Sequence, residues 1–129
     1  MLDVVAAVIE RNGRFLIARR AAHKPMSGYW EFPGGKIEDG ETSEQALRRE
    51  LREEFDVDVW VGPFLGESVY DYGETVVRLL AYRATIDDSV TGSTDHDLIE
   101  WVRPERLVDF RLAPADIPLV DKLLETGVD

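Results

Sequence analysis

The sequence predicts an α+β fold in which helices cover the faces of a mixed central β-sheet. Several stretches are typical of strands, a segment near the middle is a clear amphipathic helix, and another helical segment lies near the C-terminus. The length of 129 residues and the hydrophobic fraction of 44% suit one domain around one core. We therefore expect residues 1–129 to form a single domain.

The first third of the chain is predicted to begin with a β-hairpin. Asn12-Gly13 separates two apolar runs and is a strong signal for a tight turn, because both residues tolerate a positive φ. Residues 20–28 are small, polar or basic and are expected to form a loop. A third, short strand stops at Pro33-Gly34-Gly35. The three predicted strands span residues 4–9, 14–19 and 29–32.

Residues 43–55 form the clearest predicted helix. Thr42 and Gln45 have the spacing of a capping box, which marks a helix N-terminus. Apolar residues recur every four positions and predict a core stripe of Leu47, Leu51 and Phe55. The rest of the chain is expected to add strands at 57–61, 65–71, 75–84 and 98–102, a short helix at 104–107 and a final helix at 115–126.

The composition excludes several classes of function. A net charge of −11 disfavours binding to long DNA or RNA, whereas a free nucleotide stays possible because a divalent cation reverses the local sign. The absence of cysteine excludes disulfides and thiolate metal sites. No apolar run approaches the ~20 residues that span a bilayer, and the start lacks the basic region of a secretory signal. We expect a cytoplasmic protein without membrane contact; the sequence carries no signal for an oligomeric state.

Three glutamates gather on one side of the predicted helix. At ~100° per residue, Glu50, Glu53 and Glu54 fall within an arc of about 100° beside the core stripe, so we expect them to flank the buried face. Glu50 and Glu54 are four residues apart and repel each other. A hard cation such as Mg²⁺ removes that repulsion. The alternative is a solvated helix with ion pairs such as Arg49–Glu53.

A glycine-rich turn before the helix favours the metal-site interpretation. Gly34 and Gly35 let the backbone approach a ligand closely and expose carbonyl groups to a cation. Glu41 adds an acid just before the helix. Together these residues reproduce the Nudix box: Gly35, five residues, Glu41, seven residues, Arg49-Glu50-Leu51, one residue, Glu53-Glu54.

The resemblance to the Nudix hydrolases extends beyond the box. Residues 30–36 (WEFPGGK) and 112–118 (LAPADIP) resemble the MutT-type branch, and the similarity runs from residue 4 to about residue 125. It implies the Nudix fold, an α/β/α sandwich with a mixed central β-sheet. The chain departs from the motif at Asp56, where the family has a glycine. That glycine is expected to end the helix in a left-handed conformation, which aspartate adopts at a cost of about 1 kcal/mol.

The resemblance also implies a metal-dependent catalytic site. Mg²⁺, with Mn²⁺ as an alternative, would be held by the Gly34 carbonyl, Glu50, Glu53 and Glu54. Glu50 matches the acid that is favoured as general base. Arg49 would orient the carboxylates, Glu41 would support the site through a second metal or water, and Asp95 aligns with a distal acid of the branch.

Five residues are candidates for substrate contacts. Arg20 and Lys36 are cations near strand ends that can meet phosphates. Asp116 aligns with the base-contacting residue of the branch, and an ionised aspartate only accepts hydrogen bonds, which suits cytosine or 8-oxoguanine; alternatively, it caps the last helix. Phe32 and Tyr72 can stack on the base or belong to the core.

The implied reaction is hydrolysis of a nucleoside triphosphate to a monophosphate and diphosphate. We expect CTP or dCTP as substrate, with an oxidised nucleotide such as 8-oxo-dGTP close behind, and the role would be nucleotide-pool sanitation. Two alternatives stay open: a hydrolase of another nucleoside diphosphate derivative, and a non-catalytic nucleotide-binding module.

Overall fold

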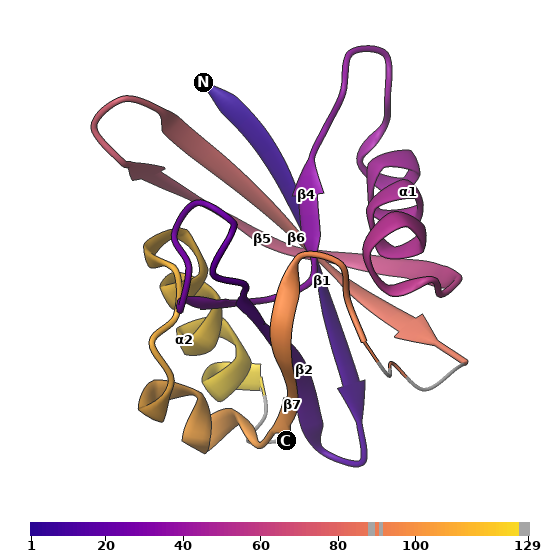
Figure 1. The fold of residues 1–129 in the computed structure, drawn as a ribbon. Helices are drawn as coiled ribbons and strands as arrows, with labels where there is room; N and C mark the ends of the chain where they lie inside the picture. Colours follow the sequence, from indigo (N-terminus) through magenta and orange to yellow (C-terminus); the bar gives the residue numbers. More distant parts are fainter. Residues whose placement is uncertain (88–89, 91, 127–129) are drawn as a thin grey trace.

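The computed structural model describes residues 1–87, 90 and 92–126, and within them seven strands form one mixed sheet (Figure 1). The strands are β1 (Leu2–Arg11), β2 (Arg14–Arg20), β3 (Trp30–Glu31), β4 (Gly34–Lys36), β5 (Val59–Asp71), β6 (Val76–Ile86) and β7 (His96–Val102). The helices are α1 (Ser43–Phe55) and α2 (Ile117–Thr126), with the 3₁₀ helices η1 (Pro104–Asp109) and η2 (Pro114–Asp116). The predicted α+β class is confirmed.

Strand β1 organises the sheet. It runs parallel to β6, whereas the other paired strands are antiparallel. β1 and β2 pair only beside their turn, at Glu10–Phe15 and Arg11–Arg14. Farther along, β2 pairs with β7 and β4 pairs with β1, where Gly34 lies opposite Ala6. The divergence of β1 and β2 therefore brings the glycine turn next to the middle of the sheet.

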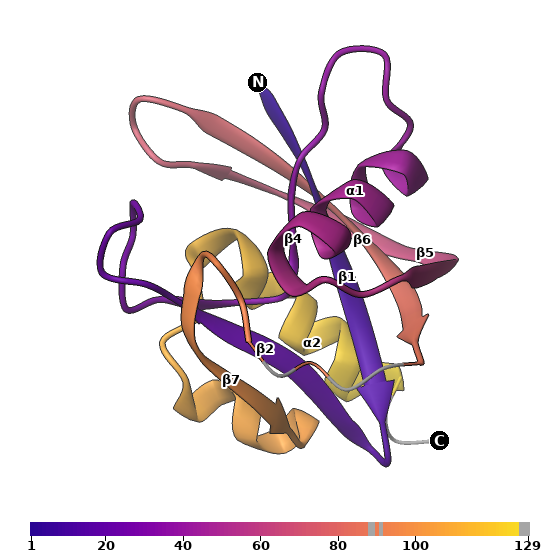
Figure 2. The ribbon, with the colours of Figure 1, turned by 45° about the vertical axis from the view of Figure 1, so that its right-hand side comes forward.

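Alternation along β1 divides the core between the two faces of the sheet. Val5, Ala7 and Ile9 pack in an apolar cluster with α1, whereas Ala6 and Val8 pack in a second cluster with α2. Successive side chains of a strand point to opposite faces, so one strand serves both layers. Helix α1 lies on one face and α2 on the other, which confirms the predicted sandwich (Figure 2). No helix in the described residues is long and apolar enough to cross a membrane.

The predictions about turns and helix ends are confirmed. Asn12 and Gly13 both have positive φ, 55° and 76°. The Gln45 backbone N–H donates to Thr42 Oγ1 (3.1 Å), and the Thr42 N–H donates to Gln45 Oε1 (2.9 Å), which completes the capping box. Asp56 ends α1 in the left-handed conformation, with φ 55° and ψ 42°.

Two regions differ from the sequence-based expectation. Gly34 and Gly35 were expected to lie in a turn but belong to β4, because the departure of β2 leaves an edge of β1 to be paired. Segments 57–61 and 65–71 were expected to be separate strands but belong to β5, whose register shifts between Val61 and Gly66. β5 lies at an edge of the sheet, where a bulge and Pro63 are tolerated. The other predicted elements have ends shifted by at most two residues.

Replacing Asp56 with glycine is expected to stabilise the fold. Glycine adopts the left-handed conformation without a Cβ penalty, so the free energy of unfolding should rise by about 1 kcal/mol. The lost ion pair with Arg52 joins two exposed side chains and contributes little. Chemical denaturation measures the change. The control is Asp58→Ala, which removes another ion pair of Arg52 but leaves the helix end intact. A D56G protein no more stable than the wild type would contradict this reading.

Candidate active site

Arg49 is the polar centre of helix α1. Its guanidinium donates to both carboxylate oxygens of Glu41 (2.7 and 2.9 Å), to Glu50 Oε1 (3.0 Å), to Glu53 Oε2 (3.3 Å) and to the Lys36 carbonyl (2.9 Å). The hydrogen bond to Glu41 is the largest cause that raises the pKa of Arg49 above its ordinary value. The Arg49–Glu53 pair suggested by the sequence is present, and Arg49 fixes the carboxylates around it.

Glu41 precedes α1, and both of its carboxylate oxygens accept hydrogen bonds from Arg49. The hydrogen bond from Arg49, followed by one from the Glu38 backbone N–H (2.9 Å), lowers the pKa of Glu41 to about 2. The carboxylate is therefore ionised at neutral pH and holds the Arg49 fork in place. Its suggested role at a second metal or a water stays a prediction.

Glu50 lies beneath the glycine turn of β4. Its carboxyl group fits against Gly35 so closely that a Cβ at that position would overlap it. The side chain is 13% exposed, and burial raises the pKa of Glu50 despite the opposing bond from Arg49. Gly35 was expected to leave space for a ligand, but its absent side chain makes room for a carboxyl group of the protein itself.

Glu54 also lies at the margin of the core. Its Oε2 atom is buried and has no hydrogen-bond partner among the described residues. Burial raises the pKa of Glu54, and the nearby charges of Glu50 and Asp95 raise it further. The Thr94 N–H donates to the Glu54 backbone carbonyl (3.2 Å), so the segment before β7 packs on the end of α1. The structure thus brings Asp95 beside Glu54.

Glu53 was expected to flank the buried face, and this is wrong. Its side chain is 58% exposed and bonds to Arg49. At 100° per residue, Glu53 lies roughly 160° from the middle of the core stripe, at the solvent end of the predicted arc. Among residues 1–87, 90 and 92–126, no three acidic, His or Cys side chains converge closely enough to hold a metal ion. Arg49 instead bonds to Glu41, Glu50 and Glu53.

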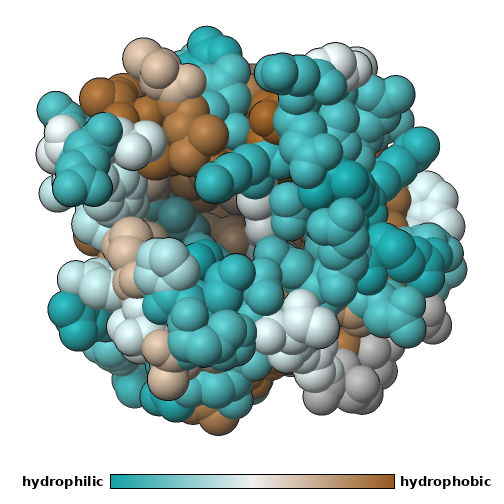
Figure 3. Space-filling view, turned by 45° about the horizontal axis from the view of Figure 1, so that its top comes forward, coloured by the Kyte–Doolittle hydropathy of each residue, from teal (hydrophilic) through white to brown (hydrophobic). Residues whose placement is uncertain are grey.

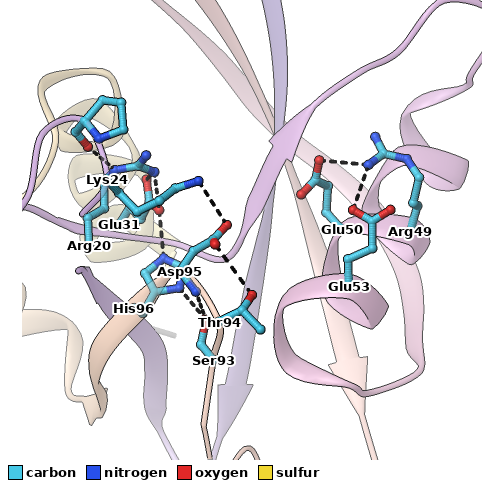
Figure 4. A network of polar contacts seen from close by, with 11 residues as sticks. Arg20, Lys24, Glu31, Arg49, Glu50, Glu53, Ser93, Thr94, Asp95 and His96 are labelled. Atoms are coloured by element: carbon cyan, nitrogen blue, oxygen red, sulfur yellow. Dashed lines mark hydrogen bonds and ion pairs between the residues drawn. The ribbon is translucent and has the colours of Figure 1, made fainter. Parts of the chain in front are cut away.

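A second polar cluster joins β2, β3 and the segment before β7 (Figure 4). Glu31 Oε2 accepts from Arg20 Nη1 (3.0 Å) and bonds to His96 Nε2 (2.8 Å). His96 is buried and stacks on Phe55 of α1, with ring centroids 5.4 Å apart. Lys24 Nζ lies 3.6 Å from a carboxylate oxygen of Asp95. The cluster therefore connects the sheet to Asp95 and to α1.

Sequence reasoning missed Glu31 and His96. The expected strand began at residue 98, yet His96 is the buried first residue of β7. The sequence gives no signal for its pairing with Glu31, which lies 65 residues away. Glu31 does give a signal, because it is a carboxylate between two aromatic residues in a short strand. Arg20, a predicted phosphate contact, is engaged by Glu31 and by the Pro25 carbonyl (2.6 Å).

Asp116 is buried at the end of η2. Its Oδ2 accepts a hydrogen bond from the Phe32 backbone N–H (2.9 Å), so the carboxyl group ties η2 to the chain after β3. The expectation of an ionised, purely accepting aspartate at this position is corrected. Burial, followed by the charge of Glu31, raises the pKa of Asp116 to about 8. Near neutral pH the group is mostly protonated and also offers a donor.

The remaining predicted substrate contacts fall into different environments. Phe32 is 3% exposed and belongs to the core, as its alternative interpretation held. Tyr72 is partly buried, and its hydroxyl accepts from the Ala115 N–H (3.1 Å) next to Asp116. Lys36 is exposed at the end of β4. Figure 3 shows a hollow left of centre on one face, lined by both hydrophilic and hydrophobic surface.

The chain is similar to known proteins along nearly its whole length. The family model described as NUDIX domain matches residues 1–123. The chain is 38% identical over 124 residues to the CTP pyrophosphohydrolase of Escherichia coli (strain K12), covering 96% of this chain and 92% of that one. It is 31% identical over 123 residues to the 8-oxo-dGTP diphosphatase of the same organism, covering 95% of each. The MutT protein from Methanosarcina mazei Go1 has the same fold, with a TM-score of 0.89 at 23% identity, covering 99% of this chain and 96% of that one.

Replacing Asp116 with asparagine is expected to change how stability depends on pH. The raised pKa of Asp116 contributes stability below pH ~4, and this is lost as pH rises toward 8. Asparagine keeps an acceptor for the Phe32 N–H without a charge. The free energy of unfolding of D116N should therefore rise relative to that of the wild type by a few kcal/mol as the pH increases across that range. Denaturation from pH 4 to 9 measures the difference. Asp109→Asn, at an exposed acid, is the control. A difference independent of pH would show that Asp116 is ionised throughout.

Proposed function

Because the chain belongs to the NUDIX domain family, we propose that it is a cytoplasmic, Mg²⁺-dependent hydrolase that converts nucleoside triphosphates to monophosphates and diphosphate. One observation carries the proposal. Glu50 and Glu54 lie close together at the margin of the core, and one buried oxygen of Glu54 has no partner among the described residues. Such an arrangement is unfavourable for the protein alone and favours a bound cation.

The donors around this oxygen fit a hard divalent cation. Carboxylate and carbonyl oxygens are the ligands that Mg²⁺ prefers, and it keeps several waters; Mn²⁺ accepts the same set. We assign the metal to Glu50, Glu53, Glu54 and the Gly34 carbonyl. The exposed side chain of Glu53 can turn toward the others. When bound, the metal would neutralise phosphate charge and make water a better nucleophile.

The protein's own groups supply the proton transfer and the orientation. Burial raises the pKa of Glu50, which makes its carboxylate a stronger acceptor for the proton of the attacking water. Arg49 holds Glu50 through Oε1, and Glu41 holds Arg49 in turn. Asp95, beside Glu54, is assigned to the same metal or to the attacking water.

The base-binding end is assigned to Asp116 and Tyr72. Because Asp116 is mostly protonated near neutral pH, it can accept from the exocyclic amine of cytosine and donate to a carbonyl of oxidised guanine. We therefore propose cytosine-type triphosphates and 8-oxo-dGTP as the substrate class, consistent with nucleotide-pool sanitation. Lys36 is the candidate for the phosphate contact, since Arg20 is engaged by Glu31.

A substrate panel tests the proposal. With Mg²⁺, the protein should hydrolyse CTP, dCTP or 8-oxo-dGTP and release diphosphate, not orthophosphate. Isotopically labelled water identifies the phosphorus attacked, and attack at the β-phosphorus places the label in diphosphate. Nucleotide sugars and dinucleoside polyphosphates serve as comparison substrates. Nucleotide-dependent thermal stabilisation without turnover would instead show a binding module, and preferred cleavage of a comparison substrate would move the assignment to that class.

Glu50→Gln should abolish most of the activity without unfolding the protein. The amide cannot accept the proton of the attacking water, so kcat should fall by about 100- to 10,000-fold. Steady-state kinetics and a thermal melt measure both quantities. Glu44→Gln is the matched control, because Glu44 is an exposed acid of the same helix that pairs with Arg48. Normal turnover by E50Q would remove Glu50 from the mechanism.

A further inference from the structure

Residues 93–96 carry Asp95 past the end of α1 into β7. Two main-chain hydrogen bonds tie this segment to its neighbours, from the Thr94 N–H to the Glu54 carbonyl (3.2 Å) and from the Ala21 N–H to the Asp95 carbonyl (3.0 Å). Neither bond uses the N–H of Asp95, which donates to Ser93 Oγ (3.2 Å). The Ser93 hydroxyl therefore helps to fix the main chain at Asp95, whose carboxylate also contacts Lys24 Nζ (3.6 Å) and Thr94 Oγ1 (3.5 Å).

The Ser93 hydroxyl is held by His96 (Figure 4). Ser93 Oγ lies 2.7 Å from His96 Nδ1, and His96 Nε2 lies 2.8 Å from Glu31 Oε2. The His96 side chain is 1% exposed and stacks on Phe55 of α1. Both ring nitrogens are thus occupied, and the plane of the ring is fixed by the helix that carries Glu54.

Hydrogen-bond chemistry gives this chain of contacts one direction. Glu31 accepts from Arg20 and faces His96 with the same oxygen, so Nε2 of His96 is the donor in the bond to Glu31. In a neutral imidazole Nδ1 is then an acceptor. The Ser93 hydroxyl donates to Nδ1 and accepts from the Asp95 N–H. In this arrangement the Ser93 hydroxyl and both ring nitrogens of His96 have hydrogen-bond partners.

We propose that His96 is a positioning residue for hydrolysis: as the Nε2–H tautomer it orients Ser93, and Ser93 holds Asp95 so that its carboxylate faces Glu54. This inference rests on the proposed hydrolase function. His96 acts through other residues: its ring contacts Glu31, Ser93 and Phe55. Removing a polar side chain that orients the ligands of a metal through hydrogen bonds typically lowers activity about 10- to 100-fold.

Two substitutions separate the roles of the two ring nitrogens. In His96→Asn the amide lies near the position of Nδ1, so the contact with Ser93 is retained and the contact with Glu31 is lost. In His96→Gln the amide reaches the position of Nε2, so the contact with Glu31 is retained and the contact with Ser93 is lost. Both variants lose the stacking on Phe55, so a purely structural role predicts similar effects for the two.

Kinetics of four variants test the proposal with the triphosphate that the wild type hydrolyses fastest. Ser93→Ala and H96Q should lower kcat about tenfold or more with little change in KM, whereas H96N should retain most of the activity. His23→Gln, at the exposed histidine of the loop after β2, is the matched control and should leave kcat unchanged. Thermal melts identify any variant that fails to fold. If H96Q fails to fold, S93A, which is a smaller change, still tests the proposal.

NMR tests the same geometry without turnover. The nitrogen shifts of His96 should show a protonated Nε2 and an unprotonated Nδ1. Exchange of the Asp95 amide should be slow in the wild type and in H96N, and faster in S93A and H96Q. The opposite tautomer, or wild-type kcat and exchange in S93A and H96Q, overturns the proposal. If the wild type hydrolyses no triphosphate while the exchange pattern holds, the hydrogen-bond chain stands and the proposed function fails.

Discussion

Two carboxyl groups, those of Glu50 and Glu54, are held at the margin of an apolar core, and the rest of the site depends on that placement. Burial favours the protonated form of each, and their mutual repulsion adds to the cost. The hydrogen bond from Arg49 offsets this cost for Glu50, whereas Glu54 Oε2 has no such partner in the described part of the chain. The arrangement persists because packing of Leu47, Leu51 and Phe55 against the sheet fixes the face of α1 on which both acids lie.

Glu31 connects the metal-binding end of the proposed site to the base-binding end. Its charge contributes to the raised pKa values of Glu54, Asp116 and Tyr72, so the carboxylate lies within electrostatic reach of all three. Arg20 and His96 fix its position from β2 and β7. A substitution of Glu31 would therefore change the pKa values of Glu54 at one end of the proposed site and of Asp116 and Tyr72 at the other.

The sequence predicted best those features that depend on neighbouring residues. The capping box of α1, its core stripe, the Asn12-Gly13 turn and the left-handed Asp56 are local, and all are present. The features that it missed depend on distant segments. Strand β4 forms because β2 leaves β1, and the Glu31–His96 pair joins residues brought together by the sheet. Spacing placed Glu50, Glu53 and Glu54 on one helix, but the bond from Arg49 to Glu53 and the position of the Glu50 carboxyl group against Gly35 depend on three-dimensional packing.

The cations near the site are largely neutralised by the protein's own acids. Arg20 is paired with Glu31, Lys24 with Asp95, and Arg49 with several carboxylates, on a chain whose net charge is −11. A free polyphosphate approaching this surface meets repulsion that exposed Lys36 relieves only in part. The divalent cation of the proposed mechanism would supply the missing positive charge to the acids and to the phosphates together. Binding of metal and of nucleotide should therefore be coupled, and by thermodynamic reciprocity each strengthens the other by the same factor. In the proposed mechanism, a cation that arrives with the nucleotide would relieve the unfavourable burial of Glu54.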